Sequence, residues 1–522
     1  MKRKALGIIV AAVAALPVFV NADEVGNAKF KECLTSTMTK TCTLTENVTV
    51  NEQLDVAGNI KLDLNGYSVT AAENLEIPGG LITVLHGGTL TIEDAKGNGK
   101  ITTGDTSKVY SPLQMTKKDK TDVSKKATLI VNGGHLEGYY YAVCGNGNPD
   151  RINTEVVINS GKLSVTSKTG TAIYQPQVGK TIVNGGEIKG ATGIEVRSGE
   201  LEVNGGTIIG TEKPVTVTPN GNGTTSIGAG IAVAQHTTKN DIKVVINGGT
   251  IQGFSALYES NPQKNSAEDI AKIKITVKDG NLEAINEGTE VVYSENKLIT
   301  VEGGNFNEEL SEDIVMPEGT KSYEVITLDG EFKHVVIEEE KVEEGYFGLS
   351  FEREALEEIE NEELKETLKE VDKALADKYT AAIYYEIVYG DLIDNKFVLG
   401  TEISELKENI EVTLDLPENL AQLKEGYNRV YKVIRVHYNE ETKKYETDIL
   451  DVKEVKDGKV TFETDKFSTY VLAYEDVKAE TTTNTTKNPN TFDGISLYMI
   501  IASISFIGLA SVITYSKKAK NN

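Results

Sequence analysis

The chain has 522 residues and a formal net charge of −25, with 48 glycines and no tryptophan. This length is enough for two to four domains. Because a nucleic-acid-binding surface needs positive charge, the acidic composition excludes that class of partner. At the N-terminus, Met1-Lys2-Arg3-Lys4 is followed by an apolar run that ends at Val20-Asn21-Ala22. This pattern predicts a secretory signal peptide over residues 1–22.

The segment after the signal peptide is predicted to cap a repeat domain. Residues 24–37 can form a short amphipathic helix, and we assign 23–45 as a cap over the open end of the repeats. Cys33 and Cys42 lie in this segment. In an exported protein they either form a disulfide or stay reduced, and the sequence leaves both alternatives open.

An aliphatic residue followed by Asn-Gly-Gly, or a close variant, recurs through residues 46–310. The clearest copies are Val131–Gly134, Ile158–Gly161, Val183–Gly186, Val203–Gly206 and Ile246–Gly249. Each copy joins two short aliphatic runs, so we expect two short strands with glycine at positive φ in the corner between them. A second column holds Ile173, Ile194, Ile231 and Leu257, and Asn184, Ile194 and Asn204 stand ten residues apart. The minimal coil is therefore about 20 residues, which predicts a β-solenoid.

Two other architectures, a leucine-rich repeat and a β-sandwich, fit this pattern less well. A leucine-rich repeat would need a leucine framework, which these residues lack. Antiparallel strands of a β-sandwich would not share one fixed column. The stretches Ile60–Tyr67 and Gly88–Asp94, with the Asn-Gly-Gly repeats, resemble bacterial surface proteins of the pectate-lyase-like superfamily. That resemblance implies a right-handed parallel β-helix.

One outward row of the solenoid is a candidate ligand-binding site. The repeat register places Tyr174, Glu195 and Tyr258 in one outward row with Cys144, and strand alternation points Arg197 the same way. Because tyrosine rings can stack on sugars, we expect a glycan-binding face formed by these residues. The resemblance also raises a polysaccharide lyase, but no carboxylate cluster for calcium is apparent, and we assign no catalytic residue, metal or cofactor.

The C-terminal half has a different pattern. After a connecting β segment at 311–350, apolar residues recur at helical spacing over 351–378, which predicts an amphipathic helix. Residues 379–477 read as strands separated by polar turns, and we expect a β-sandwich stalk domain. Residues 478–494 are a polar linker that includes a sorting motif.

The last residues predict a membrane anchor. Residues 495–515 carry no charge and are long enough to span a bilayer, and the basic tail 516–522 should stay cytoplasmic. Just before them, Asn488-Pro489-Asn490-Thr491-Phe492 resembles a Gram-positive sortase sorting signal, although it differs from Leu-Pro-x-Thr-Gly at the first and last positions. The resemblance implies cleavage after Thr491 and linkage to the cell wall.

Three functions remain open from the sequence. The first is a cell-surface adhesin or binding protein that displays the β-helix outside the cell and takes a glycan or a host-surface ligand. The second is a surface polysaccharide lyase or glycoside hydrolase. The third is a structural envelope spacer. Because one fold hosts many functions, only the geometry of a site can separate them.

Overall fold

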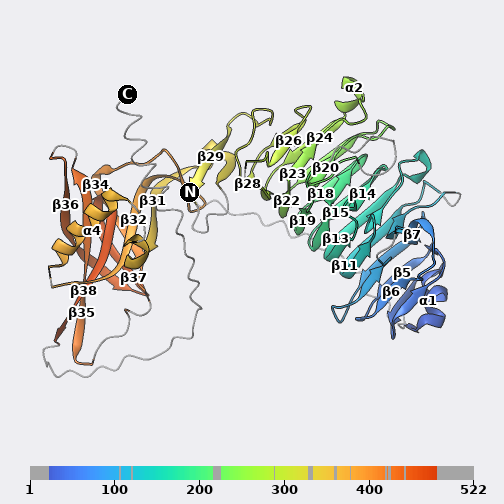
Figure 1. The fold of residues 1–522 in the computed structure, drawn as a ribbon, viewed down its shortest axis with the longest axis horizontal. Helices are drawn as coiled ribbons and strands as arrows, with labels where there is room; N and C mark the ends of the chain where they lie inside the picture. The colour runs from blue at the N-terminus through green and yellow to red at the C-terminus, as the bar shows by residue number, and fades with distance from the viewer. Residues whose placement is uncertain are drawn as a thin grey trace, which may run out of the picture. The chain divides into compact units, whose positions relative to one another are not determined.

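The computed structural model describes residues 23–478 except 105–106, 119–121, 215–224, 287, 327–332, 358–360, 377, 418–419, 421–424 and 440–441. The predicted signal peptide, sorting motif and membrane span lie outside the described residues. Among the residues that are described, no helix is long and apolar enough to cross a membrane. The chain divides into two compact units: unit 1 ends at Val301 and includes Leu310–Val315, and unit 2 holds Glu302–Glu309 and continues from Met316 (Figure 1).

Unit 1 consists of short parallel strands in three stacks, in which successive coils pair with one another. Stack 1 precedes the Asn-Gly-Gly corner. It contains β1 (Asp23–Val25), β2 (Lys40–Leu44), β5 (Asn59–Asp63), β8 (Thr89–Glu93), the first halves of β11 (Ala127–Gly138) and β13 (Thr154–Val165), β15 (Gly179–Val183), β18 (Gly199–Val203), β21 (Ile242–Ile246), β24 (Ile273–Val277) and β27 (Ile299–Val301).

Stack 2 follows that corner. It contains β3 (Val48–Val50), β6 (Ser68–Ala71), β9 (Lys100–Thr102), the second halves of β11 and β13, β16 (Glu187–Gly190), β19 (Thr207–Gly210), β22 (Thr250–Gly253) and β25 (Asn281–Ala284). Stack 3 is a nine-stranded sheet. It contains β4 (Leu54–Val56), β7 (Ile77–Val84), β10 (Val109–Met115), β12 (Val143–Cys144), β14 (Thr171–Gln175), β17 (Thr192–Val196), β20 (Ala229–Val233), β23 (Ser255–Glu259) and β26 (Val292–Ser294).

The predicted aliphatic column is confirmed by the register of stack 3. Ile173 pairs with Ile194, Ile194 with Ile231, and Ile231 with Leu257. All four side chains are almost fully buried. Branched apolar side chains therefore lie over one another along the inside of the coils, where their burial stabilises the stacks.

The Asn-Gly-Gly corners form a ladder on the outside of unit 1. The side-chain amide of each asparagine donates to the side-chain oxygen of the one before it, at 2.8–2.9 Å, in the order Asn132, Asn159, Asn184, Asn204 and Asn247. The second glycine of each corner has positive φ, for example 85° at Gly186 and 82° at Gly206. Stacked identical amides satisfy one another along a parallel stack, so the motif joins coils as well as turning the chain.

The first coil carries a short helix, α1 (Asn27–Leu34), in which Phe30, Cys33 and Leu34 are buried. Strand β1 pairs with β2, and a disulfide joins Cys33 to Cys42. Of the two alternatives for this cysteine pair, the structure therefore has the bonded one. Short connecting helices at Pro149–Arg151 and α2 (Ala267–Ile270) lie in loops of later coils.

Unit 2 has two layers of antiparallel strands and a helix. The larger layer has the order β31–β32–β38–β35–β36, and β36 bends to pair with β37, which pairs with β34 in the second layer. The strands are β31 (Glu343–Phe351), β32 (Thr380–Ile393), β34 (Glu405–Asp415), β35 (Tyr427–Asn439), β36 (Lys444–Lys456), β37 (Lys459–Lys466) and β38 (Thr469–Lys478). Smaller strands are β28 (Gly304–Phe306), β29 (Thr320–Ile326), β30 (His334–Glu338) and β33 (Lys396–Val398), and Glu339–Lys341 forms a 3-10 turn.

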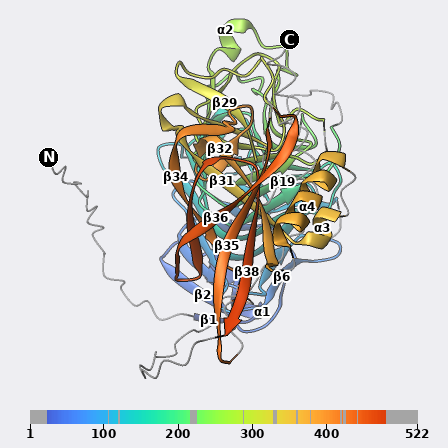
Figure 2. The same ribbon diagram turned by 90° about the vertical axis from the view of Figure 1, so that its left-hand side faces the viewer.

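The predicted helix over 351–378 appears as α3 (Arg353–Glu357) and α4 (Glu362–Leu375). Leu364, Leu368 and Val371 of α4 belong to a buried cluster on one face of the larger layer. The second layer covers the opposite face, where Val412 and Phe462 are buried. The larger layer is thus the middle of unit 2, between the helices and the second layer (Figure 2).

Candidate functional site

The outward row predicted on stack 3 exists in the register of the strands. Cys144 pairs with Tyr174 and Tyr174 with Glu195. The row continues from Glu195 through Ala232 and Tyr258 to Tyr293. Because opposed residues of a parallel sheet share a face, these side chains point away from the aliphatic column.

The middle of this row is covered, which corrects the expectation of an open face. Tyr174 is 5% exposed, and Glu195 and Arg197 are fully buried. Facing outward from a sheet does not mean facing solvent, because Thr225 and Ser226 lie against Glu195 and Thr192, and Tyr141 stacks on Tyr174. Tyr174, Glu195 and Arg197 therefore do not form the accessible ligand site that the alternation predicted.

Glu195 holds the returning chain. One carboxylate oxygen accepts a hydrogen bond from the Thr225 hydroxyl at 2.6 Å and from the Thr225 amide at 2.9 Å. The Thr192 hydroxyl donates to the Ser226 carbonyl at 2.9 Å. Because breaking these bonds would leave a buried carboxyl group unsatisfied, Glu195 is a structural anchor for residues 225–226.

The Arg197 side chain forms hydrogen bonds within the protein. Its guanidinium donates to the Tyr174 hydroxyl at 3.2 Å and to the Ala234 carbonyl at 3.4 Å. Burial raises the pKa of the Tyr174 hydroxyl to about 12, against the opposing effect of the nearby guanidinium. A buried arginine whose N–H groups donate to other protein groups is out of reach of a substrate in solvent and cannot act as its base.

An accessible aromatic surface lies beside the covered row, at the corner between stacks 2 and 3. Tyr110 and Tyr140 meet edge to face with centroids 5.3 Å apart, and Tyr139 meets Tyr140 at 4.7 Å. Tyr141 follows at 6.4 Å from Tyr140 and stacks on Tyr174 at 5.1 Å. We call Tyr110, Tyr139, Tyr140 and Tyr141 the tyrosine patch. Its outermost member, Tyr110, is 36% exposed, and the other three are partly exposed.

Backbone hydrogen bonds hold the patch in place. The amides of Tyr140 and Tyr141 both donate to the Tyr110 carbonyl, at 3.1 and 3.0 Å. The Tyr140 carbonyl accepts from the Thr171 amide of the next coil at 2.9 Å. Rings carried on such a rigid corner lose little conformational freedom when they bind a ligand.

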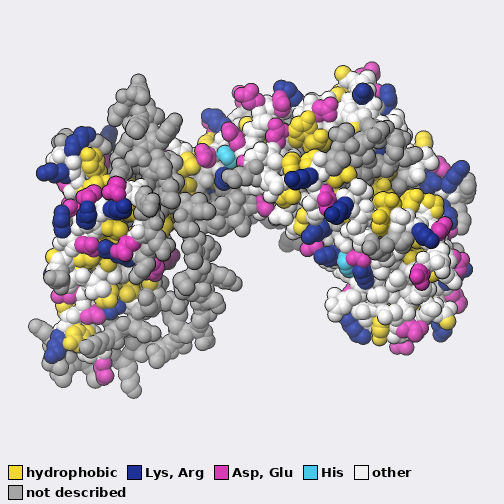
Figure 3. Space-filling view, viewed as in Figure 1, with side chains coloured by type: hydrophobic (Ala, Val, Ile, Leu, Met, Phe, Trp, Pro, Cys, Tyr) yellow, Lys and Arg dark blue, Asp and Glu magenta, His cyan; other side chains and the backbone are white. Residues whose placement is uncertain are grey.

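A second aromatic pair stands further along the row. Tyr258 and Tyr293 stack with centroids 4.7 Å apart and an interplanar angle of 15°. Both are partly exposed, and the pKa of each hydroxyl is raised, first by burial and then by neighbouring charged groups that include Glu295. Of the four residues predicted to bind a ligand, Tyr174, Glu195, Arg197 and Tyr258, the last is the one with an accessible side chain. On the face of unit 1 in view in Figure 3, hydrophobic side chains gather in separate patches.

Among the described residues of unit 1, Cys144 and His135 are side chains of a type that serves in catalysis, and Cys144 is buried while His135 is partly buried. Burial raises the pKa of the Cys144 thiol to about 12, so the nucleophilic thiolate is absent at neutral pH. The His135 ring bonds the Ser164 hydroxyl at 2.7 Å, and burial lowers the pKa of this histidine. Across the described stretches of the chain, His, Cys, Asp and Glu side chains form no group that could hold a metal ion.

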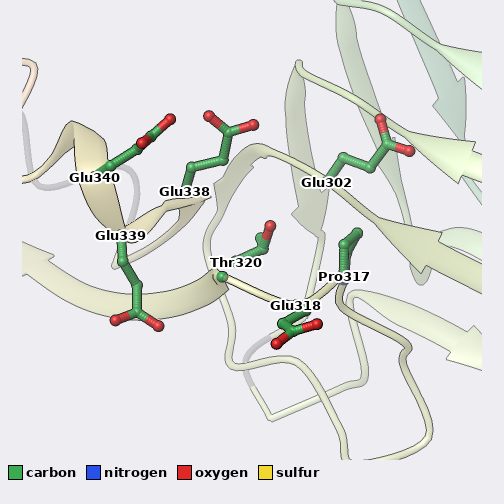
Figure 4. Close-up of a pocket in the computed structure, with 8 residues that line it drawn as sticks. Glu302, Pro317, Glu318, Thr320, Glu338, Glu339 and Glu340 are labelled. Carbon is green, nitrogen blue, oxygen red and sulfur yellow. The ribbon is translucent and has the colours of Figure 1, made fainter.

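Unit 2 has an acidic hollow between β30 and the turn that precedes β29. It is lined by Glu302, Glu318, Glu338, Glu339 and Glu340, with Pro317, Gly319 and Thr320. Its carboxylates point in different directions, and none of them meets another (Figure 4). Lysines neutralise two of them, because Lys341 pairs with Glu338 and Lys321 with Glu339, each at 3.1 Å. The hollow therefore presents no convergent set of ligands.

Comparisons with protein-family models, with curated proteins and with solved structures found no match for this chain. The tyrosine patch has a signal in the sequence, the run Gly138-Tyr139-Tyr140-Tyr141, which directly precedes a strand of stack 3. Column spacing did not single it out, because Tyr139, Tyr140 and Tyr141 lie at a corner between strands, and Tyr110, on β10, lies outside the predicted row.

Proposed function

We propose that this chain is an exported protein, anchored at the cell surface, whose unit 1 is a right-handed parallel β-helix that binds extracellular carbohydrate at the tyrosine patch. The parallel pairing of the three stacks supports the β-helix. The signal-peptide pattern at 1–22, the apolar segment 495–515 and the sorting motif support export and anchoring.

The tyrosine patch carries the binding proposal. Tyr110, Tyr139 and Tyr140 form a contiguous, partly exposed aromatic surface on a rigid corner. Tyrosine presents an apolar ring face on which the C–H face of a sugar can stack, and a hydroxyl that can bond a sugar hydroxyl. Aromatic anchors of this type dominate the binding energy of many interfaces.

Binding is favoured over polysaccharide cleavage by the state of the groups that a lyase would need. An arginine can serve as the base of such a lyase, and of the two arginines in residues 46–310, Arg197 is fully buried and Arg151 is 5% exposed. A hydrolase would need two accessible carboxyl groups that flank the bond to be cut. On the outward row Glu195 is buried and bonded to Thr225.

The proposal is tested by screening the full chain against immobilised neutral and acidic glycans. We expect binding that Tyr139→Ala and Tyr140→Ala each weaken about 30-fold, the effect of losing about 2 kcal/mol from an aromatic anchor. The matched control is Tyr438→Ala in unit 2, since Tyr438 is 38% exposed but lies outside the patch. Retained binding in both patch variants, or an equal loss in the control, would contradict the assignment of this site.

A further inference from the structure

Strand β31 (Glu343–Phe351) lies at the edge of the larger layer of unit 2. Its nine residues pair with β32 in continuous register, and no other strand among the described residues pairs with it. The edge strand of the second layer, β34, is different. Its register with β37 shifts between Glu405 and Ile410, and the Tyr346 hydroxyl bonds both the amide and the carbonyl of Thr413.

The edge of β31 has few of the features that normally protect a sheet edge, and its only charged residues are Glu343 and Glu344 at the start of the strand. Exposed edges are usually blunted by lysine, proline, a bulge or short length, because their free amide and carbonyl groups can pair with another chain. The sequence of β31, Glu-Glu-Gly-Tyr-Phe-Gly-Leu-Ser-Phe, contains neither lysine nor proline, and its pairing with β32 has no register shift. A nine-residue edge of this kind can accept a further strand.

The sequence of β31 is complementary to itself. If two copies run antiparallel with Phe347 opposite Phe347, all nine residues of each copy have a partner. Gly345 then lies opposite Leu349, and Gly348 lies opposite Tyr346. Each glycine thus faces a larger side chain, an arrangement in which an aromatic residue can cover the exposed backbone of glycine across the strands.

The charges of β31 also permit this register. Glu343 would lie opposite Phe351, and Glu344 opposite Ser350, so no two glutamates face each other. Like charges directly opposite would destabilise the pair. Because the same residues meet twice around a two-fold axis, the contact is closed and produces a dimer, not a filament.

We propose that β31 is a self-association edge, through which two copies of this chain form a two-fold dimer with a continuous sheet across the contact. The partner is therefore a second copy of the chain. This inference is independent of carbohydrate binding, which concerns unit 1.

Position 350 allows a test in which two variants move in opposite directions. Ser350 is exposed, and in the proposed register it faces the exposed Glu344 of the second copy twice per dimer. Ser350→Lys places opposite charges across the contact and should tighten the dimer, whereas Ser350→Glu places like charges there and should weaken it. With two such pairs per dimer, we expect shifts of the dimer Kd of about 2- to 30-fold in each direction.

The measurement is sedimentation equilibrium of the full chain in mild detergent over a range of concentrations, at low salt. Thermal unfolding of each variant checks that the fold is retained. A dimer whose Kd falls in Ser350→Lys and rises in Ser350→Glu supports the proposal. A chain that stays monomeric throughout, or a dimer in which both variants shift the same way or neither shifts, overturns it.

Discussion

The side chain of Glu386, on strand β32, is buried in unit 2. Glu386 lies opposite Leu349 of β31, and its carboxyl group accepts a hydrogen bond from the Thr469 hydroxyl at 2.9 Å. Burial raises the pKa of this carboxyl to about 7. The folded state therefore holds a proton that the unfolded chain, whose glutamates titrate near pH 4.3, has already released.

This difference predicts how stability depends on pH. Because the folded state binds the extra proton, the stability associated with protonated Glu386 is fully present below about pH 4. It is lost as pH rises to about 7, by about 4 kcal/mol. Glu386→Gln keeps an acceptor for Thr469 and cannot ionise. We expect the variant to be more stable than the unaltered chain at pH 8 and similar to it at pH 4, measured by urea unfolding. An equal stability difference at both pH values would refute the assignment.

On the outward row, burial turns residues predicted to bind a ligand into structural ones. Glu195 and Arg197 alternate as the sequence predicts, yet both are fully buried, and Thr225 lies over Glu195. Glu195 bonds to Thr225, and Arg197 bonds to Tyr174 and Ala234, so both side chains are engaged within the protein and do not face a ligand in solvent. The identity and spacing of these residues carried no information about what covers them.

At the scale of the element, the Asn-Gly-Gly corner has two separate requirements for glycine. Gly206 has a φ of 82°, and a Cβ there would lie 2.8 Å from the backbone of Gly185 and Gly186 in the previous coil. Gly97 has a similar φ of 85°, but a Cβ there would meet nothing within 4 Å. Both positions require positive φ, but only Gly206 also requires the absence of a Cβ because of contact with the previous coil.

We therefore expect unequal effects of alanine at these glycines. Gly97→Ala should cost about 1–2 kcal/mol, the price of positive φ for a residue with a Cβ. Gly206→Ala should cost about 1–3 kcal/mol more, because a rigid coil must shift to admit the methyl group. The free energies of unfolding from denaturant titration give both values. Equal losses would mean that contact between coils does not restrict the corner.

At the scale of the whole molecule, the two units are built on different rules. In unit 1 each coil contacts mainly its neighbours, so stability is close to a sum of coil and contact terms along the stack, and the ends open first. The N-terminal end is closed by α1 and by the disulfide between Cys33 and Cys42. Unit 2 instead packs two layers and the helices α3 and α4 around buried clusters that include residues far apart in sequence.

Reduction of the disulfide should therefore act locally before it acts globally. The bond joins residues nine apart, and closing a loop of that length stabilises a fold by about 2–3 kcal/mol. With reductant present, we expect hydrogen exchange to rise first in β1 and β2, while β17 and unit 2 stay protected. Uniform loss of protection across unit 1 would show that the stack unfolds as one unit.

The sequence by itself determined the parallel strand stacks, the aliphatic column through Ile173 and Ile194, and the glycine corners. These features depend on local rules: side chains alternate along a strand, glycine admits positive φ, and a fixed period places like residues over one another. The tertiary structure alone decided which outward residues meet solvent. Whether a loop such as 225–226 crosses Glu195 depends on contacts between segments far apart in the chain, and no local period encodes them. That is why the candidate site lies on the corner tyrosines and not on the predicted row.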